Sequence, residues 1–310
     1  MLRIAVPDLV SNSYFPIIAA VEMGFFKQEG FDASVDLLFP IPKTFEALRD
    51  GQLDFVVGSA HATLLAFPEW QGAKLLAACG QHTYWFLVIR SDLNPQRGDL
   101  SIVKGLRIGA APGVNLSLQR MLVEAGIDPE ENHVQIMPIP GAAGPNVSFG
   151  LSAAKALEEG TLDGFWANGM GCEVAVRRGV GTMVLDVRRG DGPTVARHYT
   201  FSALVATDKT INDNPAAARA AIRAMMKAHK SLKQDPNRAT AVGQKRFPPS
   251  EAELIAELVR RDLPYYDPTI PPEKVESMNR FAQDIGLLKS PATYDRVVAS
   301  QFSHLWNEPV

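Results

Sequence analysis

The sequence is poor in cysteine, with only Cys79 and Cys172 among its 310 residues. Two thiols are too few for the disulfide framework of a small secreted domain, and we interpret both as unpaired. No histidine or cysteine pair has the spacing of zinc ligands, since the six histidines are scattered along the chain. A P-loop and a Ser, His and Asp order typical of hydrolases are also missing. We therefore expect no metal site and no cofactor.

Clusters of basic charge and long apolar runs are lacking as well. No run of Lys or Arg exceeds two residues, the net charge is −3, and the pI is about 6.1. Nucleic-acid-binding proteins usually present a basic face, so the sequence argues against such a partner. The apolar segment Phe15–Phe26 contains Glu22 and is too short to span a bilayer.

The start of the chain shows no export signal. Residues 2–6 already have the pattern of a strand, and neither a basic segment nor a cleavage site precedes them. Either an export signal has been removed from this sequence or the protein is made without one. We expect a periplasmic location in the first case and a cytoplasmic one in the second.

Short β-rich segments alternate with helical patterns along most of the chain. With 46% hydrophobic and 21% charged residues, the composition is that of an ordinary globular protein. A chain of this length favours two domains. The alternation predicts an α/β fold with mostly parallel sheets. The predicted strands are Arg3–Val6, Ala33–Leu37, Phe55–Val57, Leu75–Ala78, Trp85–Arg90, Arg107–Ala110, Val134–Met137, Gly164–Trp166, Met183–Asp186 and Ser202–Thr207.

The last third of the chain is predicted to be helical and without strand partners. Asn214 and Pro215 are typical of a helix start, and an Ala-rich helix over 216–232 follows. A capping box at Ser250–Glu253 predicts a second helix. Two more are expected over 272–285 and 294–305. We expect this tail to pack on the first lobe.

An internal repeat indicates two similar lobes. Residues Ala47–Asp54 read ALRDGQLD, and Ala156–Asp163 read ALEEGTLD. Each copy is typical of a helix end, a Gly that stops the helix, and an Asp that leads into a strand. A second pair, RIAVP from Arg3 and RIGAA from Arg107, lies upstream at a similar offset. Two pairs in the same order favour duplication of an α/β unit.

Several segments resemble a known family. They are Tyr14–Phe31 with its GFFKQEGF ending, both copies of the ALxxGxLD repeat, Lys104–Gly109 (KGLRIG), and Thr200–Pro215. The chain resembles the nitrate/sulfonate/taurine-type solute-binding proteins of ABC importers, together with their thiamine-pyrimidine-precursor relatives. The resemblance covers most of the chain and weakens from about residue 240.

The resemblance implies a two-lobed type II periplasmic-binding-protein fold with a helical C-terminal extension. Lobe one would comprise residues 1–88 plus 203–310, and lobe two would comprise 89–202. A small ligand would bind in a cleft between the lobes as they close about a hinge. Proteins of this family are usually monomers, and an ABC permease would be the partner.

Ligands of open α/β sheets bind outside the carboxyl ends of the strands, where helix N-termini offer free N–H groups. This rule selects the polar and aromatic residues that follow predicted strands in both lobes. The loop Pro138–Phe149 is expected to form a rim of the site. The predicted ligand-binding residues are Ser11, Asn12, Ser13, Tyr14, Ser59, His61, His82, Tyr84, Trp85, Asn115, Ser117, Trp166, Asn168 and Glu173.

Each candidate also has an ordinary structural interpretation, and the sequence leaves both open. Short polar side chains before a helix are N-caps as well as ligand contacts, and Ser59 is the expected cap before His61. The His61 ring would stay neutral at a helix N-terminus, which suits a ligand amide, hydroxyl or ring nitrogen. Tyr84 and Trp85 either pack between the lobes or form a stacking wall for a flat ligand.

The candidate set contains no obvious Arg or Lys, although anionic ligands usually require one. Arg90, Arg188 and Arg189 are available, but the sequence does not place them. We therefore expect a small neutral or weakly charged compound, with aromatic and heterocyclic rings favoured.

The alternative is a cytoplasmic enzyme on the same fold, of decarboxylase, desulfinase or pyrimidine-precursor type. His61 lies in an Asp…His-x-x-Leu context similar to the pyrimidine synthase of that family. However, no Lys between Asp54 and His61 is available to hold pyridoxal phosphate, and a cysteine-rich run is missing. A desulfinase would need an activated Cys, and neither thiol has a neighbouring base in sequence. His61, His82 and Glu173 are the first candidates for a titratable catalytic group.

Overall fold

The computed structural model describes residues 1–142 and 147–309, and it divides the chain into two compact units. Unit 1 comprises Met1–His82 and Thr200–Val310, and unit 2 comprises Thr83–Tyr199. Part of the loop predicted to form a rim, residues 143–146, lies outside the described residues. No helix in the described part of the chain is both long and apolar enough to cross a membrane.

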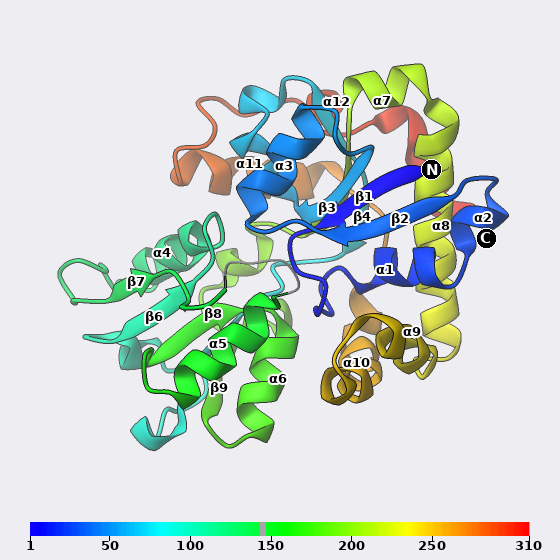
Figure 1. The fold of residues 1–310 in the computed structure, drawn as a ribbon. Helices are drawn as coiled ribbons and strands as arrows, with labels where there is room; N and C mark the ends of the chain where they lie inside the picture. The colour runs from blue at the N-terminus through cyan, green and yellow to red at the C-terminus, as the bar shows by residue number, and fades with distance from the viewer. Residues whose placement is uncertain (143–146, 310) are drawn as a thin grey trace. The chain divides into compact units, whose positions relative to one another are not determined.

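Unit 1 is built on a five-stranded sheet in the order β2-β1-β3-β10-β4 (Figure 1). Neighbours β2, β1 and β3 are parallel, while β10 is antiparallel to both β3 and β4. Both central strands β3 and β10 are almost completely buried, as continuous apolar runs in a sheet covered on both faces should be. The strands are β1 (Leu2–Val6), β2 (Ala33–Leu37), β3 (Phe55–Ser59), β4 (Ala73–Gly80) and β10 (Ser202–Thr207).

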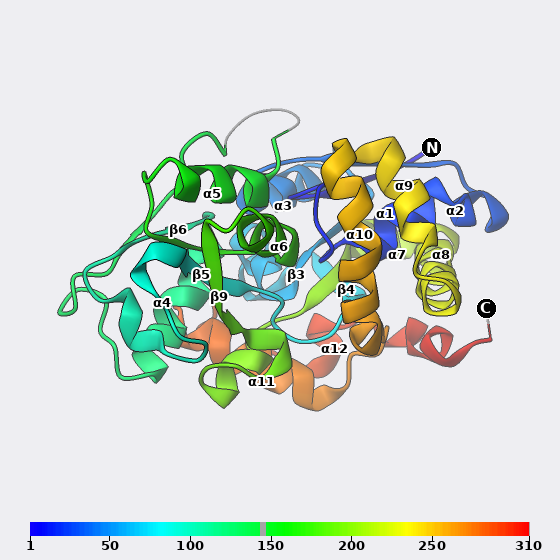
Figure 2. The same cartoon turned by 90° about the horizontal axis from the view of Figure 1, so that it is seen from below.

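Helices cover both faces of this sheet. In Figure 1, α1 (Phe15–Glu22) lies on one side of the strands and α3 (Ile41–Arg49) lies on the other. The long helix α8 (Pro215–Gln234) packs against α1 and β4. Figure 2 shows α9 and α10 side by side, as their contacts confirm. The remaining helices of unit 1 are α2 (Phe25–Gln28), η1 (Ala60–Leu65), η2 (Pro68–Trp70), α7 (Asp208–Asp213), α9 (Arg238–Arg246), α10 (Pro249–Asp262), η7 (Leu263–Tyr265), α11 (Pro272–Asp284), α12 (Tyr294–Val297) and η8 (Ser300–Asn307).

Unit 2 repeats this plan around the sheet β7-β6-β8-β5-β9. Strands β7, β6 and β8 are parallel, and β5 is antiparallel to both β8 and β9. The strands are β5 (Phe86–Arg90), β6 (Arg107–Ala110), β7 (Gln135–Met137), β8 (Gly164–Ala167) and β9 (Gly181–Asp186). The helices are η3 (Ser91–Leu93), η4 (Leu100–Val103), α4 (Asn115–Glu124), α5 (Phe149–Glu158), α6 (Gly169–Arg177), η5 (Val187–Arg189) and η6 (Thr194–His198).

The ten predicted strands correspond to β1–β10, but two expectations about the tail are wrong. Helix α10 begins at Pro249, and no side chain caps it, so the pattern at Ser250–Glu253 is not a capping box. The helix expected over 294–305 is broken at Val298, which forms a parallel bridge with Leu75. The tail thus does pair with the sheet edge, because β4 has an open side there.

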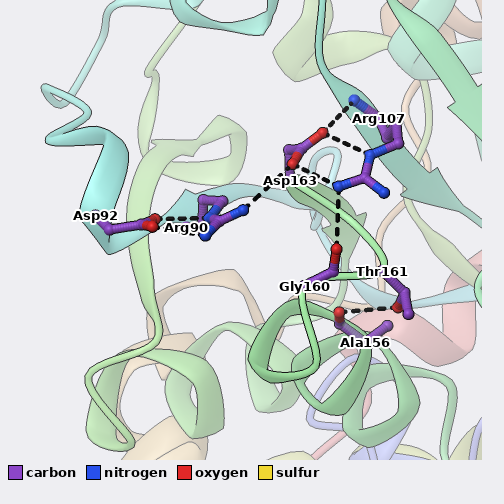
Figure 3. A network of polar contacts seen from close by, with 7 residues as sticks. All are labelled: Arg90, Asp92, Arg107, Ala156, Gly160, Thr161 and Asp163. Carbon is purple, nitrogen blue, oxygen red and sulfur yellow. Dashed lines mark hydrogen bonds and ion pairs between the residues drawn. The ribbon is translucent and has the colours of Figure 1, made fainter.

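The sequence repeat forms the same contact in both units. In unit 2, the Asp163 carboxylate accepts the backbone N–H of Arg107 at 3.0 Å, and Arg107 Nη2 donates to the Gly160 carbonyl at 3.0 Å (Figure 3). In unit 1, Asp54 accepts the N–H of Arg3 at 2.7 Å, and Arg3 Nη2 donates to Gly51 at 2.9 Å. The repeated residues thus hold β1 beside β3 in unit 1 and β6 beside β8 in unit 2.

Replacing Asp163 with Asn is expected to lower the free energy of unfolding at pH 7 by about 2 kcal/mol. Hydrogen bonding to Arg107 is the main cause that lowers the pKa of Asp163 from 3.8 to about 2. Its stabilisation is complete above pH 3.8 and is lost as the pH falls through about 2. Urea unfolding measures the loss. Asp54→Asn is the matched control, expected to cost less than about 1 kcal/mol because that carboxylate is more exposed (30% against 14%). Equal losses would contradict this account.

Candidate functional site

The polar loops of unit 1 meet at one edge of its sheet. Because β1, β3 and β4 are parallel, their carboxyl ends lie at the same edge, where β10 begins. Ser202, the first residue of β10, pairs with Ser59 of β3 on one side and with Gly80 of β4 on the other. The predicted residues of this unit lie at or after these strand ends: Ser11, Asn12, Ser13, Tyr14, Ser59, His61 and His82.

The loop after β1 does not cap the helix that follows it. Tyr14 occupies the N-cap position of α1 without a capping side-chain bond. Ser11 Oγ accepts the backbone N–H of Ser13 at 3.1 Å, and the Asn12 side chain reaches across to the end of α10, where Nδ2 donates to Asp262 Oδ2 at 2.6 Å. The N-cap interpretation of this loop is therefore wrong. Its side chains are buried and turned inward.

His61 lies in η1, a 3₁₀ helix that directly follows β3. Its side chain is buried, and its Nδ1 is 3.0 Å from Thr200 Oγ1. The ring packs edge-to-face on Phe281 of α11, with centroids 5.1 Å apart. The Ser59 side chain, expected to cap this helix, makes no capping bond to it. Thr200 and Phe281 thus orient the imidazole from two distant parts of the chain.

His82 ends the first segment of unit 1 in a left-handed backbone conformation, with φ of 64°. Its ring packs edge-to-face on Tyr265, with centroids 5.9 Å apart. Gln81 beside it donates from Nε2 to the carbonyls of Asp267 and Thr269, at 2.7 and 2.9 Å. The tail segment 265–269 therefore holds Gln81 and His82 in place.

The matching edge of unit 2 carries aromatic side chains. Tyr84, Trp85 and Trp166, which we call the aromatic trio, are all buried. The Tyr84 and Trp85 ring centroids are 5.2 Å apart, and those of Trp85 and Trp166 are 6.0 Å apart. Each pair is tilted by 51°, so the three rings form one packed apolar cluster. Tilted aromatic pairs of this kind add packing energy beyond the apolar area that they bury.

Ser117 holds Trp166 in place. Its hydroxyl donates to the Val114 carbonyl at 2.6 Å and accepts the indole N–H of Trp166 at 3.0 Å. Both contacts lie inside unit 2 and are buried. The only proton of this hydroxyl is thus engaged within the protein, and Ser117 acts on a ligand through the position of the Trp166 ring.

The other predicted residues of unit 2 also have structural contacts. Asn168 Oδ1 caps α6 by accepting the N–H groups of Met170 and Gly171, at 2.9 and 3.1 Å. Asn115 Oδ1 accepts the N–H of Gly113 at 3.0 Å. Glu173 pairs with Arg177 at 2.5 Å. Asn168 is thus the N-cap of α6. The cap uses its side-chain oxygen and not its amide nitrogen.

The three arginines that the sequence left unplaced have different surroundings. Arg90 is paired with Asp92 and Asp163, at 2.6 and 3.6 Å, and Arg189 is paired with Asp186 at 2.5 Å. Arg188 is buried in η5 after β9, with its guanidinium carbon 5.6 Å from the Tyr84 ring centroid. The sequence therefore did not reveal that Arg188 is a cation next to the aromatic trio. A cation over a ring face is attracted by the ring electrons.

No group of His, Cys, Asp or Glu among the described residues has the geometry of a metal site. Both thiols are buried: Cys79 lies in β4, and Cys172 lies in α6. The Cys79 carbonyl is 2.8 Å from Nε2 of His229 on α8. These surroundings place both thiols in the interior of their units.

Comparisons with known proteins bear on the fold. A family model described as NMT1/THI5 like matches residues 11–239, and no curated protein matches the sequence. The periplasmic nitrate-binding protein NrtA from Synechocystis PCC 6803 is 16% identical, with a TM-score of 0.73 over 98% of this chain and 86% of that chain. The ligand-binding component of an ABC-type import system from Staphylococcus aureus is 15% identical, with a TM-score of 0.71 over 100% and 98%.

An enzyme shares this architecture. The desulfurization enzyme DSZB is 14% identical, with a TM-score of 0.65 over 99% of both chains. At these identities the likeness concerns the fold alone. It confirms the predicted α/β fold of the type II periplasmic binding proteins, with its helical C-terminal extension.

Proposed function

Since the chain belongs to the NMT1/THI5-like family, we propose that it is the solute-binding protein of an ABC importer. The family resemblance expected from the sequence is confirmed by the match over residues 11–239. The observation that carries the proposal is the location of the side chains. Each unit gathers buried polar or aromatic groups at the carboxyl edge of its own sheet, where ligands of α/β proteins bind. These carboxyl edges are where we propose that the ligand binds.

The ligand we propose is a small organic compound with an aromatic or heterocyclic ring. The aromatic trio supplies apolar ring surface from unit 2. His61 and the loop Ser11–Tyr14 supply hydrogen-bonding groups from unit 1. A few placed polar groups around an apolar wall are typical of small-molecule sites.

The location and partners follow from the same proposal. NrtA is described as periplasmic, and the Staphylococcus aureus protein is described as part of an import system. We propose a periplasmic location for this protein. It acts as a monomer that delivers its ligand to an ABC permease.

Replacing His61 with Ala is expected to raise the dissociation constant of the ligand about tenfold, which corresponds to about 1.4 kcal/mol. Thr200 and Phe281 fix the orientation of the imidazole, and Ala removes its hydrogen-bonding nitrogens. Calorimetric titration with the compound recovered from the purified protein gives the constant. His304→Ala, at an exposed position of η8, is the control and should change nothing. An unchanged affinity of His61→Ala would remove this residue from the site.

The enzyme alternative rests on the likeness to DSZB. A desulfinase would need a reactive thiol in the site, and low-pKa thiols are usually partly exposed near cations. Cys79 and Cys172 are both buried. We therefore expect the protein to release its ligand unchanged. Conversion of that compound during incubation, followed by mass spectrometry, would favour the enzyme instead.

A further inference from the structure

Most arginines of unit 2 are paired with a carboxylate. Seven of the nine arginines in this unit form ion pairs: Arg90, Arg97, Arg107, Arg120, Arg177, Arg178 and Arg189. Arg188 lies against the Tyr84 ring. The ninth is Arg197, and its guanidinium makes no ion pair, hydrogen bond or ring contact with another described residue. Arg197 therefore carries a positive charge that the described part of the protein does not pair.

Arg197 lies at the carboxyl edge of the unit 2 sheet. It belongs to η6, which packs against η5, and η5 directly follows the carboxyl end of β9. The Arg197 carbonyl accepts the backbone N–H of Thr83 at 3.0 Å, and Thr83 directly precedes Tyr84. Strand β5 starts at this edge because it runs antiparallel to β8 and β9. The backbone of Arg197 is thus held next to the segment that carries two rings of the aromatic trio.

The carboxylates that follow β9 are already engaged with other arginines. Asp186, the last residue of β9, pairs with Arg189 at 2.5 Å, and Asp191 pairs with Arg97 at 3.0 Å. Asp191 also accepts the backbone N–H of Asp186 at 2.9 Å. These contacts use the acidic side chains between η5 and η6 within the protein, and none of them involves Arg197.

The guanidinium of Arg197 is only partly open to water. The residue is half-buried, and its Nε is shielded from solvent without a hydrogen-bond partner among the described residues. A solvated arginine instead keeps its charged head in water and covers apolar surface with its stem. A shielded N–H without an acceptor costs free energy, and a guanidinium cannot lose its proton to avoid that cost. The position therefore favours binding of an anionic acceptor from outside the chain.

The geometry of a guanidinium selects the kind of anion. Its Nε–H and one Nη–H point in the same direction and form a planar, rigid fork. This fork matches the two oxygens of a carboxylate, which accept two parallel charge-assisted hydrogen bonds. The aromatic trio lies on the neighbouring segment and offers apolar contact to a ring. A ring that carries a carboxylate engages both features.

We propose that Arg197 binds a carboxylate group on the ring-containing ligand. This inference rests on the proposed function and names the class of compound that the protein carries, an aromatic or heterocyclic acid. It changes the expectation of a neutral or weakly charged ligand, because Arg197 was not among the arginines considered in the sequence. Arg197 then acts as a specificity-determining residue of unit 2.

Benzoate and benzamide share a ring and a planar head group but differ in charge, and their calorimetric titration at pH 7 tests the proposal. We expect benzoate to bind at least about tenfold more tightly than benzamide. Arg197→Gln keeps an N–H donor but removes the charge and the fork, so it should abolish that margin. Arg197→Lys keeps the charge without the fork and should retain part of it. Arg178→Gln is the control and should preserve the margin, because Arg178 pairs with Glu158 at the C-terminal end of α6.

The outcomes separate this inference from the proposed function. The inference is overturned if benzamide binds as tightly as benzoate, if the margin survives Arg197→Gln, or if neither compound binds. In each case a compound that co-purifies with the protein still supports a binding function. A lower melting temperature of Arg197→Gln, with the margin retained, identifies Arg197 as a structural residue only.

Discussion

The free energy of unfolding is expected to fall by about 3 kcal/mol between pH 7 and pH 4, because of His229. Its ring is buried in α8, stacks on Tyr266 with centroids 5.0 Å apart, and has Nε2 2.8 Å from the Cys79 carbonyl. Burial is the main cause that lowers the pKa of His229 from 6.5 to about 4. The folded protein thus holds the ring neutral, while the unfolded chain binds a proton below pH 6.5. Stability is complete above pH 6.5 and is lost as the pH falls toward 4.

Urea unfolding of wild-type protein and His229→Gln across this pH range measures the effect. Gln keeps an N–H group for the Cys79 carbonyl but does not titrate, so its curve should be nearly flat between pH 7 and pH 4. The exposed His304→Gln is the control and should follow the wild type. Asp163 does not interfere, because its stabilisation is lost only below pH 3.8. A wild-type curve that is flat over this range contradicts a neutral buried His229.

Trp166→Ala is expected to have the largest effect on ligand binding. The substitution removes the ring at the end of the aromatic trio and leaves Ser117 Oγ without its indole donor. Loss of a stacked aromatic contact costs about 1–3 kcal/mol, so the dissociation constant should rise about tenfold to a hundredfold. As a large-to-small change in a buried position, it should also lower the free energy of unfolding by about 3–5 kcal/mol.

Trp70→Ala separates the two effects. Trp70 is also buried, but it precedes β4 in unit 1, at the edge of the sheet opposite the proposed ligand edge. We expect a comparable loss of unfolding free energy and an unchanged dissociation constant. Both variants are to be titrated at a temperature where they are folded, as circular dichroism shows. If both weaken binding equally, the loss reflects general instability, and the aromatic trio is not the ligand wall.

Much of the fold was predictable because its determinants are local or repeated. The strand pattern is read from short apolar runs, and the two copies of ALxxGxLD pointed to two similar units before the structure showed their shared contact. That contact needs Asp163 and Arg107, which lie 56 positions apart, and only the structure shows that they meet. The break at Val298 was missed because it depends on an open sheet edge, which the sequence of the tail does not reveal.

The candidate site was only partly predictable. Residues that follow strands were found from the rule on carboxyl ends, but their bonding depends on partners elsewhere in the chain. Ser117 was expected to contact the ligand, yet its hydroxyl engages Trp166 of a different element. Asp262 lies 250 positions from Asn12 in a tail that resembles the family least, so no local pattern indicated it. The sequence named Arg188 as an available cation but did not locate it, and only the fold brings it next to Tyr84.

The most direct measurement of the central claim is native mass spectrometry of the purified protein, followed by denaturing release of the bound compound. The account predicts one small ring-containing molecule per chain. That molecule should be recovered unchanged after prolonged incubation with fresh protein. Recovery of a converted product would contradict a binding function and identify an enzyme. Protein that carries no compound and binds none from a library of ring-containing amines, acids and neutral heterocycles would contradict the proposed ligand class.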